Sequence, residues 1–146
     1  MKPLKVNQNI TFGANGNIGD FALRGWSLWE KNPSSTWTEE PVAGLQFSAL
    51  SSALGLGLRV CGLPFLGNGL IKLQNVQVHL NGLYCGMLQA RSEFDQILPL
   101  QSDWLLARGN QLVFTMPQAQ SPADLGLGED RRLLGVCLSA VTLVSQ

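Results

Sequence analysis

The feature of this sequence that most constrains its fold is a period of two in the apolar residues, which recurs along nearly the whole chain. In residues 43–49, for example, Leu45 and Phe47 alternate with Gln46 and Ser48. Because successive side chains of a β-strand point to opposite faces, this pattern predicts strands with one buried face. Glycine, proline, asparagine and serine separate the runs, and no convincing amphipathic helix is present. The pattern indicates an all-β fold.

The dipeptide Asn81-Gly82 predicts the position of one hairpin. A type I′ turn needs positive φ at both central residues, which asparagine and glycine tolerate best. The strand before the turn covers residues 71–80, and its apolar phase changes on the way, which predicts a β-bulge near Gln74 and Asn75. The strand after the turn, residues 83–88, is expected to return antiparallel.

The same reasoning predicts about eight or nine strands, connected by short loops. They are expected at residues 10–12, 21–24, 43–49, 54–62, 71–80, 83–88, 94–100, 111–116 and 134–144. An irregular segment runs from Gly25 to Pro41, and Ser121 is expected to cap a single helical turn that begins at Pro122 and stops at Gly126. This number and spacing of strands predict one domain, residues 1–146, built as an antiparallel, jelly-roll-like two-sheet β-sandwich.

Composition limits what such a domain can bind. Nearly half of the residues are apolar, enough for a core without disulfides, metals or cofactors. Ten basic and ten acidic residues balance, which argues against nucleic acid and membrane surfaces as partners. No apolar run approaches the roughly 20 residues that span a bilayer, and no secretory signal is seen. Isolated Cys61, Cys85 and Cys137 favour a reducing, cytoplasmic location, or an envelope-associated one if the chain is a fragment.

Three tryptophans, Trp26, Trp29 and Trp37, fall within twelve residues of a polar, loop-like segment. Exposed indoles can stack against the C–H faces of sugar rings, with polar side chains nearby to bind hydroxyl groups. Alternatively, Trp26 and Trp37 close an open end of the sandwich, and we assign Trp26 to this structural role. The residues expected to bind a ligand are Trp29, Trp37, Glu30, Glu39, Asn15 and Asn17.

A second distinctive stretch contains Asp130 and Arg132, two residues apart before a predicted strand. Their spacing predicts an ion pair that fixes the loop, and contact with a glycan or an anion is the alternative.

Together the two stretches resemble the β-sandwich domains appended to bacterial cell-envelope glycosyltransferases and phosphoglycerol-transferase-like proteins. The positions that match are Gly25, Trp26, Glu30, Trp37, Thr38, Asn81, Gly82, Ser121, Pro122, Asp130, Arg132, Leu134 and Gly135. The chain departs from the pattern at Glu39-Glu40, where those domains usually have a turn of the Asp-Gly kind. The resemblance implies an accessory, non-catalytic module with a carbohydrate-related role.

Signs of catalysis are few in the sequence. The single histidine, His79, falls on the outward face of a predicted strand, and no nucleophile elbow, phosphate-binding loop or HExxH motif occurs. Glu30 and Glu39 could in principle form a glycosidase pair, but a chain of this size shows no sign of the deep cleft this needs. Acidic residues 124–130 lack the ligand spacing of a calcium site.

We therefore expect a non-enzymatic module that recognises a bacterial surface polysaccharide or oligosaccharide. The alternative is an interaction module that packs against a partner enzyme domain or forms a homodimer.

Overall fold

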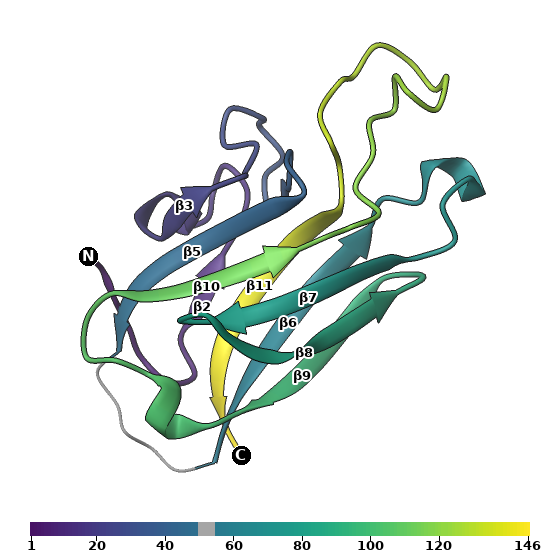
Figure 1. Ribbon diagram of the computed structural model, residues 1–146. Helices are drawn as coiled ribbons and strands as arrows, with labels where there is room; N and C mark the ends of the chain where they lie inside the picture. Colours follow the sequence, from purple (N-terminus) through teal and green to yellow (C-terminus); the bar gives the residue numbers. More distant parts are fainter. Residues whose placement is uncertain (50–54) are drawn as a thin grey trace.

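Two β-sheets packed face to face make up the molecule (Figure 1). The computed structural model describes residues 1–49 and 55–146. Their strands are β1 Pro3–Leu4, β2 Asn9–Thr11, β3 Ala22–Arg24, β4 Thr36–Trp37, β5 Val42–Ala49, β6 Leu56–Pro64, β7 Gln74–Leu80, β8 Leu83–Ala90, β9 Phe94–Leu100, β10 Asn110–Thr115 and β11 Val136–Ser145. Short 3₁₀ turns occur at Ile18–Asp20, Gly67–Gly69 and Ser102–Trp104. Among these residues, no helix has the length or apolar character needed to cross a bilayer.

The strand order is that of a jelly roll. One sheet runs β1-β5-β10-β7-β8 with β3 also on β5, and the other runs β2-β11-β6-β9 with β4 also on β11. When the short β1, β3 and β4 are left out, eight strands remain, and they can be renumbered 1 to 8 along the chain. In these numbers the two sheets have the strand orders 2-7-4-5 and 1-8-3-6, which are those of a jelly roll. The predicted sandwich is confirmed. The parallel β1–β5 pair is an exception to its antiparallel pairing, and β1 and β4, each of two residues, were not predicted.

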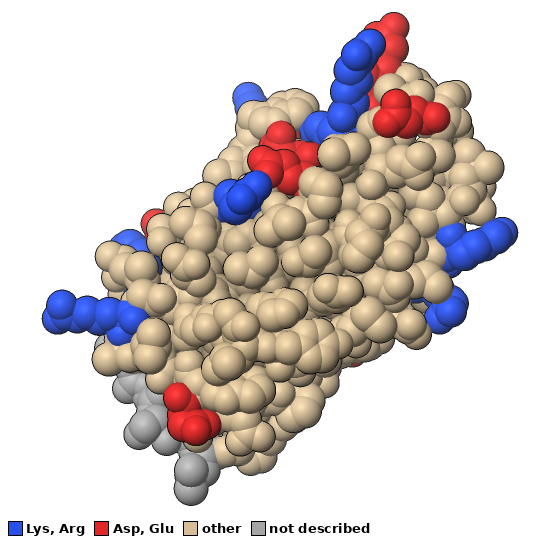
Figure 2. Space-filling view, viewed as in Figure 1, with Lys and Arg blue, Asp and Glu red and all other residues tan. Residues whose placement is uncertain are grey.

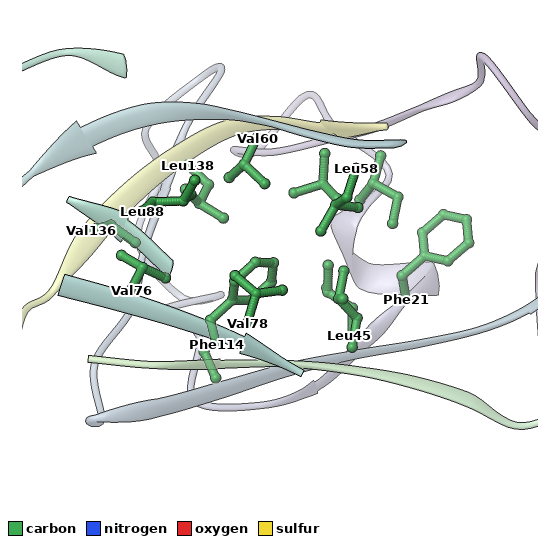
Figure 3. Close-up of a cluster of buried hydrophobic side chains, with 14 of the residues drawn as sticks. Phe21, Leu45, Leu58, Val60, Val76, Val78, Leu88, Phe114, Val136 and Leu138 are labelled. Atoms are coloured by element: carbon green, nitrogen blue, oxygen red, sulfur yellow. The ribbon is translucent and has the colours of Figure 1, made fainter. Parts of the chain in front are cut away.

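The core lies between the sheets and is built by the predicted alternation. Leu45 and Phe47 of β5 are fully buried, as are Leu56, Leu58 and Val60 of β6. Figure 3 shows side chains of the two sheets pointing toward one another across this space. Burying each such side chain contributes about 1.5–3 kcal/mol. All three cysteines are free thiols. The strand predicted from Leu54 is described from Leu56, and Leu54 lies outside the described residues.

The Asn81-Gly82 hairpin is confirmed. The two residues have φ values of 53° and 81°, and Leu80 lies opposite Leu83. The Asn81 side chain also binds the next strand, since its Oδ1 accepts the Gln111 N–H at 2.8 Å. The turn and its asparagine therefore fix the register of β7, β8 and β10 together.

The predicted position of the bulge was wrong. The β7–β8 register shifts between Val78 and His79, whose partners are Gly86 and Tyr84, so Cys85 is the extra residue. The change of apolar phase near Gln74 marks instead the first residue of β7. Ile71, an apolar residue before it, is buried but lies in the loop that precedes β7.

Candidate ligand-binding site

Arg132 joins two loops that are distant in sequence. Its Nε and Nη2 donate to the carboxylate of Asp130 at 3.0 and 2.6 Å. Its Nη1 lies 3.0 Å from Oε2 of Glu30 and donates to Oγ of Ser27 at 3.1 Å. A planar guanidinium is suited to this kind of multiple, directed pairing. The segment that contains the tryptophans is thereby fixed to the segment that precedes β11.

The charged groups of Arg132, Asp130 and Glu30 form ion pairs with one another. Hydrogen bonds from Arg132 hold the pKa of the Asp130 carboxyl below its ordinary value. The same bonds, followed by those to Glu30, raise the pKa of Arg132. Asn32 donates to the second oxygen of Glu30 at 3.0 Å. One guanidinium thus faces two carboxylates, and each of its three nitrogens has a partner within the chain, so Arg132 positions the loop.

Trp29 is the exposed tryptophan of this segment. Its side chain is 67% exposed, and the guanidinium carbon of Arg132 lies 5.2 Å from the ring centroid. A cation over an indole is attracted by the ring's negative face, which restrains the side chain. One face of the indole is therefore supported by Arg132, and the exposed remainder of the ring is available to a ligand.

The other two tryptophans are more enclosed. Trp26 is 6% exposed, its indole N–H donates to the Gly44 carbonyl at 2.8 Å, and its ring packs against Phe12 and Phe114. It is part of the buried core between the sheets. Trp37 of β4 is half-buried, with its ring edge-on to Phe65 at 6.2 Å.

Trp37 lies near the Arg132 and Glu30 ion pair. It lies opposite Cys137 in the β4–β11 pair. Burial raises the pKa of the Cys137 thiol, and the charges of Glu30 and Arg132 are close enough to act on it as well. Trp29 and Glu30 therefore contact Arg132, and Trp37 lies opposite a residue on which Glu30 and Arg132 act. Loops between strands gather at one end of the domain (Figure 1).

The remaining predicted ligand residues differ in exposure and in their contacts. Glu39 is half-buried, and its backbone binds Gly25 and Leu133. The chain bends directly afterwards, at Glu40 and Pro41. Asn15 is exposed and lies beside the segment that contains the tryptophans, since its N–H donates to the Pro33 carbonyl at 3.1 Å.

The side chain of Asn17 is hydrogen-bonded within the chain. Its Oδ1 accepts the backbone N–H of Thr11 at 2.7 Å and its Nδ2 donates to the Asn9 carbonyl at 3.4 Å. Its amide therefore holds β2 in place, and a role in binding hydroxyl groups stays a prediction.

The site contains contacts that sequence reasoning missed. Ser27 and Thr38 are buried polar residues, and Thr38 Oγ1 accepts the N–H groups of Gly135 and Val136, both at 3.1 Å. The adjacent Trp37-Thr38 pair and the Leu134-Gly135 pair belong to the resembling motifs, but nothing in the sequence shows that they meet. Both oxygens of Glu30 have partners within the chain, Arg132 for Oε2 and Asn32 for Oε1. Across residues 1–49 and 55–146, no group of three or more His, Cys, Asp or Glu could hold a metal ion.

Comparison with known proteins bears on the fold. No protein-family model and no curated protein matches the chain. A CBM6 module from Clostridium stercorarium, solved in complex with cellobiose, is similar with a TM-score of 0.53 and 9% identity, over 99% of this chain and 98% of that one. A family GH115 4-O-methyl-α-glucuronidase with specificity for decorated arabinogalactans has a TM-score of 0.48 and 13% identity. It covers 97% of this chain but 16% of the enzyme, a likeness too weak to support an inference. The chain shares its β-sandwich fold with a carbohydrate-binding module.

Proposed function

We propose that this chain is a non-catalytic carbohydrate-binding module in which a sugar ring stacks on Trp29. The observation that carries the proposal is an indole that is 67% exposed yet restrained over Arg132. A rigid exposed aromatic loses little conformational entropy on binding, and its apolar face suits the C–H surface of a pyranose. The shared fold with a module solved with cellobiose supports the same function.

The residues around Trp29 divide into two roles. Trp37, Glu39 and Asn15, which are half-buried or exposed, are the residues we propose to supply apolar surface and polar groups for sugar hydroxyls. Glu30, Asp130 and Ser27 act through Arg132, because their polar atoms are taken up in holding it. They are positioning residues, and their loss would displace the Trp29 platform rather than remove a contact with the sugar.

The biological setting is part of the proposal. The Gly-Trp, Trp-Thr and Asp-x-Arg motifs resemble those of modules beside enzymes that build bacterial surface polysaccharide. The ligand we propose is accordingly a bacterial surface polysaccharide or oligosaccharide. We propose a cytoplasmic location, or an envelope-associated one if the chain belongs to a larger protein.

The test is a bacterial-glycan array, followed by titration of each hit using tryptophan fluorescence. The substitution Trp29→Ala should weaken binding about tenfold, equivalent to ~1.4 kcal/mol, because it removes the stacking surface. Its melting temperature should match that of the parent, since the ring is largely in solvent.

The matched control is Leu28→Ala, which removes an exposed apolar neighbour that is not aromatic. Its affinity should equal that of the parent chain. A blank array, or equal affinity of the Trp29→Ala variant, would reject the proposal.

A further inference from the structure

We infer that β8 is an assembly edge through which two copies of this chain pair antiparallel about a twofold axis. β8 is the last strand of its sheet, bonded to β7 on one side only. Pairing two such edges joins two six-stranded sheets into one of twelve strands. A twofold contact of this kind requires an edge that is complementary to itself.

The composition of β8 leaves its edge unprotected. Its eight residues, Leu83–Ala90, include no charged residue and no proline. Tyr84 is 56% exposed and Met87 is 39% exposed, so large side chains on the outer face of this edge strand are open to a second copy. Exposed edges of this length usually carry lysine, proline or an inward charge, because they otherwise pair with other chains.

The other edges of the described sheets carry those protective features. β9 contains Pro99 and the exposed Asp95, whose carboxylate pairs with Arg59. β1 is two residues long between two lysines, and β3 is three residues long and ends at Arg24. β2 and β4 have three and two residues. Among these edges, β8 is therefore the long one without a charged residue or a proline.

The sheet face next to β8 presents no charge to a second copy. Figure 2 shows charged side chains near the ends of the molecule, and an uncharged surface over β10, β7 and β8. The outward positions there are Gln111, Val113, Thr115, Asn75, Gln77, His79, Tyr84, Met87 and Gln89. Two copies would therefore meet without repulsion between like charges.

The regular part of β8 is where pairing is expected. The Cys85 bulge interrupts the register with β7, whereas residues 86–90 continue it without a break. Bulges blunt an edge locally, so we assign the contact to residues 86–90. A contact of one strand pair is small, and such interfaces are typically weak and transient. Dimerisation is therefore expected to depend on concentration.

Pairing at β8 leaves the Trp29 site free. β3, which leads into the tryptophan segment, lies on β5 at the opposite side of the sheet. A dimer would thus carry two sites, which raises avidity for a repeating polymer without new contacts. This consequence rests on the proposed function, whereas the dimer itself does not.

The first test is sedimentation velocity over a wide range of concentration. The parent chain should move from 15.8 kDa toward twice that mass. Met87→Lys should remain at 15.8 kDa, because pairing of residues 86–90 about the axis places the two lysines diagonally across from each other on the same face. The control is Ile97→Lys, the same change at an exposed position of β9, and it should dimerise like the parent.

Hydrogen exchange of the unmodified chain gives a second test that needs no variant. Amides of residues 86–90 should become protected as the concentration rises, while those of β9 should not change. A parent chain that stays monomeric, a Met87→Lys variant that still dimerises, or protection that rises elsewhere instead would overturn the inference. Trp29→Ala should dimerise normally, which separates this result from that of the glycan test.

Discussion

At the scale of single residues, Arg132 illustrates how much of the site depends on contacts between distant parts of the chain. Its partner Asp130 is two residues away, and their ion pair could be predicted from that spacing. Its other partner, Ser27, is 105 residues away, and Glu30 and Trp29 lie in the same distant segment. No local pattern indicates which of ten acidic residues will meet a given arginine.

The pH dependence of stability should reveal the Asp130 interaction. Arg132 depresses the folded-state pKa of Asp130 below 3.8, so its contribution is fully present above pH 3.8 and is lost as the pH falls below that value. Asp130→Asn should lower the free energy of unfolding by about 1–2 kcal/mol near neutral pH, after allowance for partial exposure. Urea denaturation at several pH values should show the gap between the two proteins shrinking below pH 3.8. A gap that is constant with pH would contradict the ion pair.

At the scale of elements, local sequence chemistry predicted the position of the hairpin correctly and the position of the bulge wrongly. Asparagine and glycine favour positive φ whatever surrounds them, so Asn81-Gly82 could be placed from sequence. A change of apolar phase has two causes, a bulge or the start of a strand, and the sequence does not distinguish them. The structure has the second cause at Gln74, and the actual bulge at Cys85 leaves little trace in the alternation.

The cost of a side chain at the turn can be measured in isolation. A Cβ at Gly82 or at Gly19 would meet nothing within 4 Å, but only Gly82 has positive φ, at 81°. Gly82→Ala should therefore destabilise the fold by about 1–2 kcal/mol through backbone strain alone. Gly19→Ala should be neutral or stabilise by up to about 1 kcal/mol. Thermal unfolding of both variants checks this, and equal effects would show that φ is not the cause.

At the scale of the whole molecule, the two sheets are joined through buried polar contacts as well as the core. Thr38 follows β4, and its hydroxyl accepts the N–H groups of Gly135 and Val136 at the start of β11. It also lies 3.6 Å from the sulfur of Met116, which follows β10 in the other sheet. This residue therefore connects the tryptophan segment to both layers.

Replacing Thr38 tests that connection. Thr38→Val has nearly the same volume but leaves two buried N–H groups without an acceptor, which should cost about 2–4 kcal/mol. Thr38→Ser keeps the hydroxyl and should lose about 1 kcal/mol, the worth of a buried methyl group. Urea unfolding measures both. If the valine variant were as stable as the serine variant, the hydroxyl would not be an essential acceptor.

The sequence by itself determined the all-β class, the strands with strong alternation, the Asn81-Gly82 hairpin and the inward side chains such as Leu45 and Phe47. These depend on periodicity and on preferred φ values, which are properties of a few neighbouring residues. Only the tertiary structure decided the strand order, the joining of the Trp29 and Arg132 segments, and the position of β8 at an open edge. These depend on which distant strands pair, and alternation is the same for an edge strand and a central one.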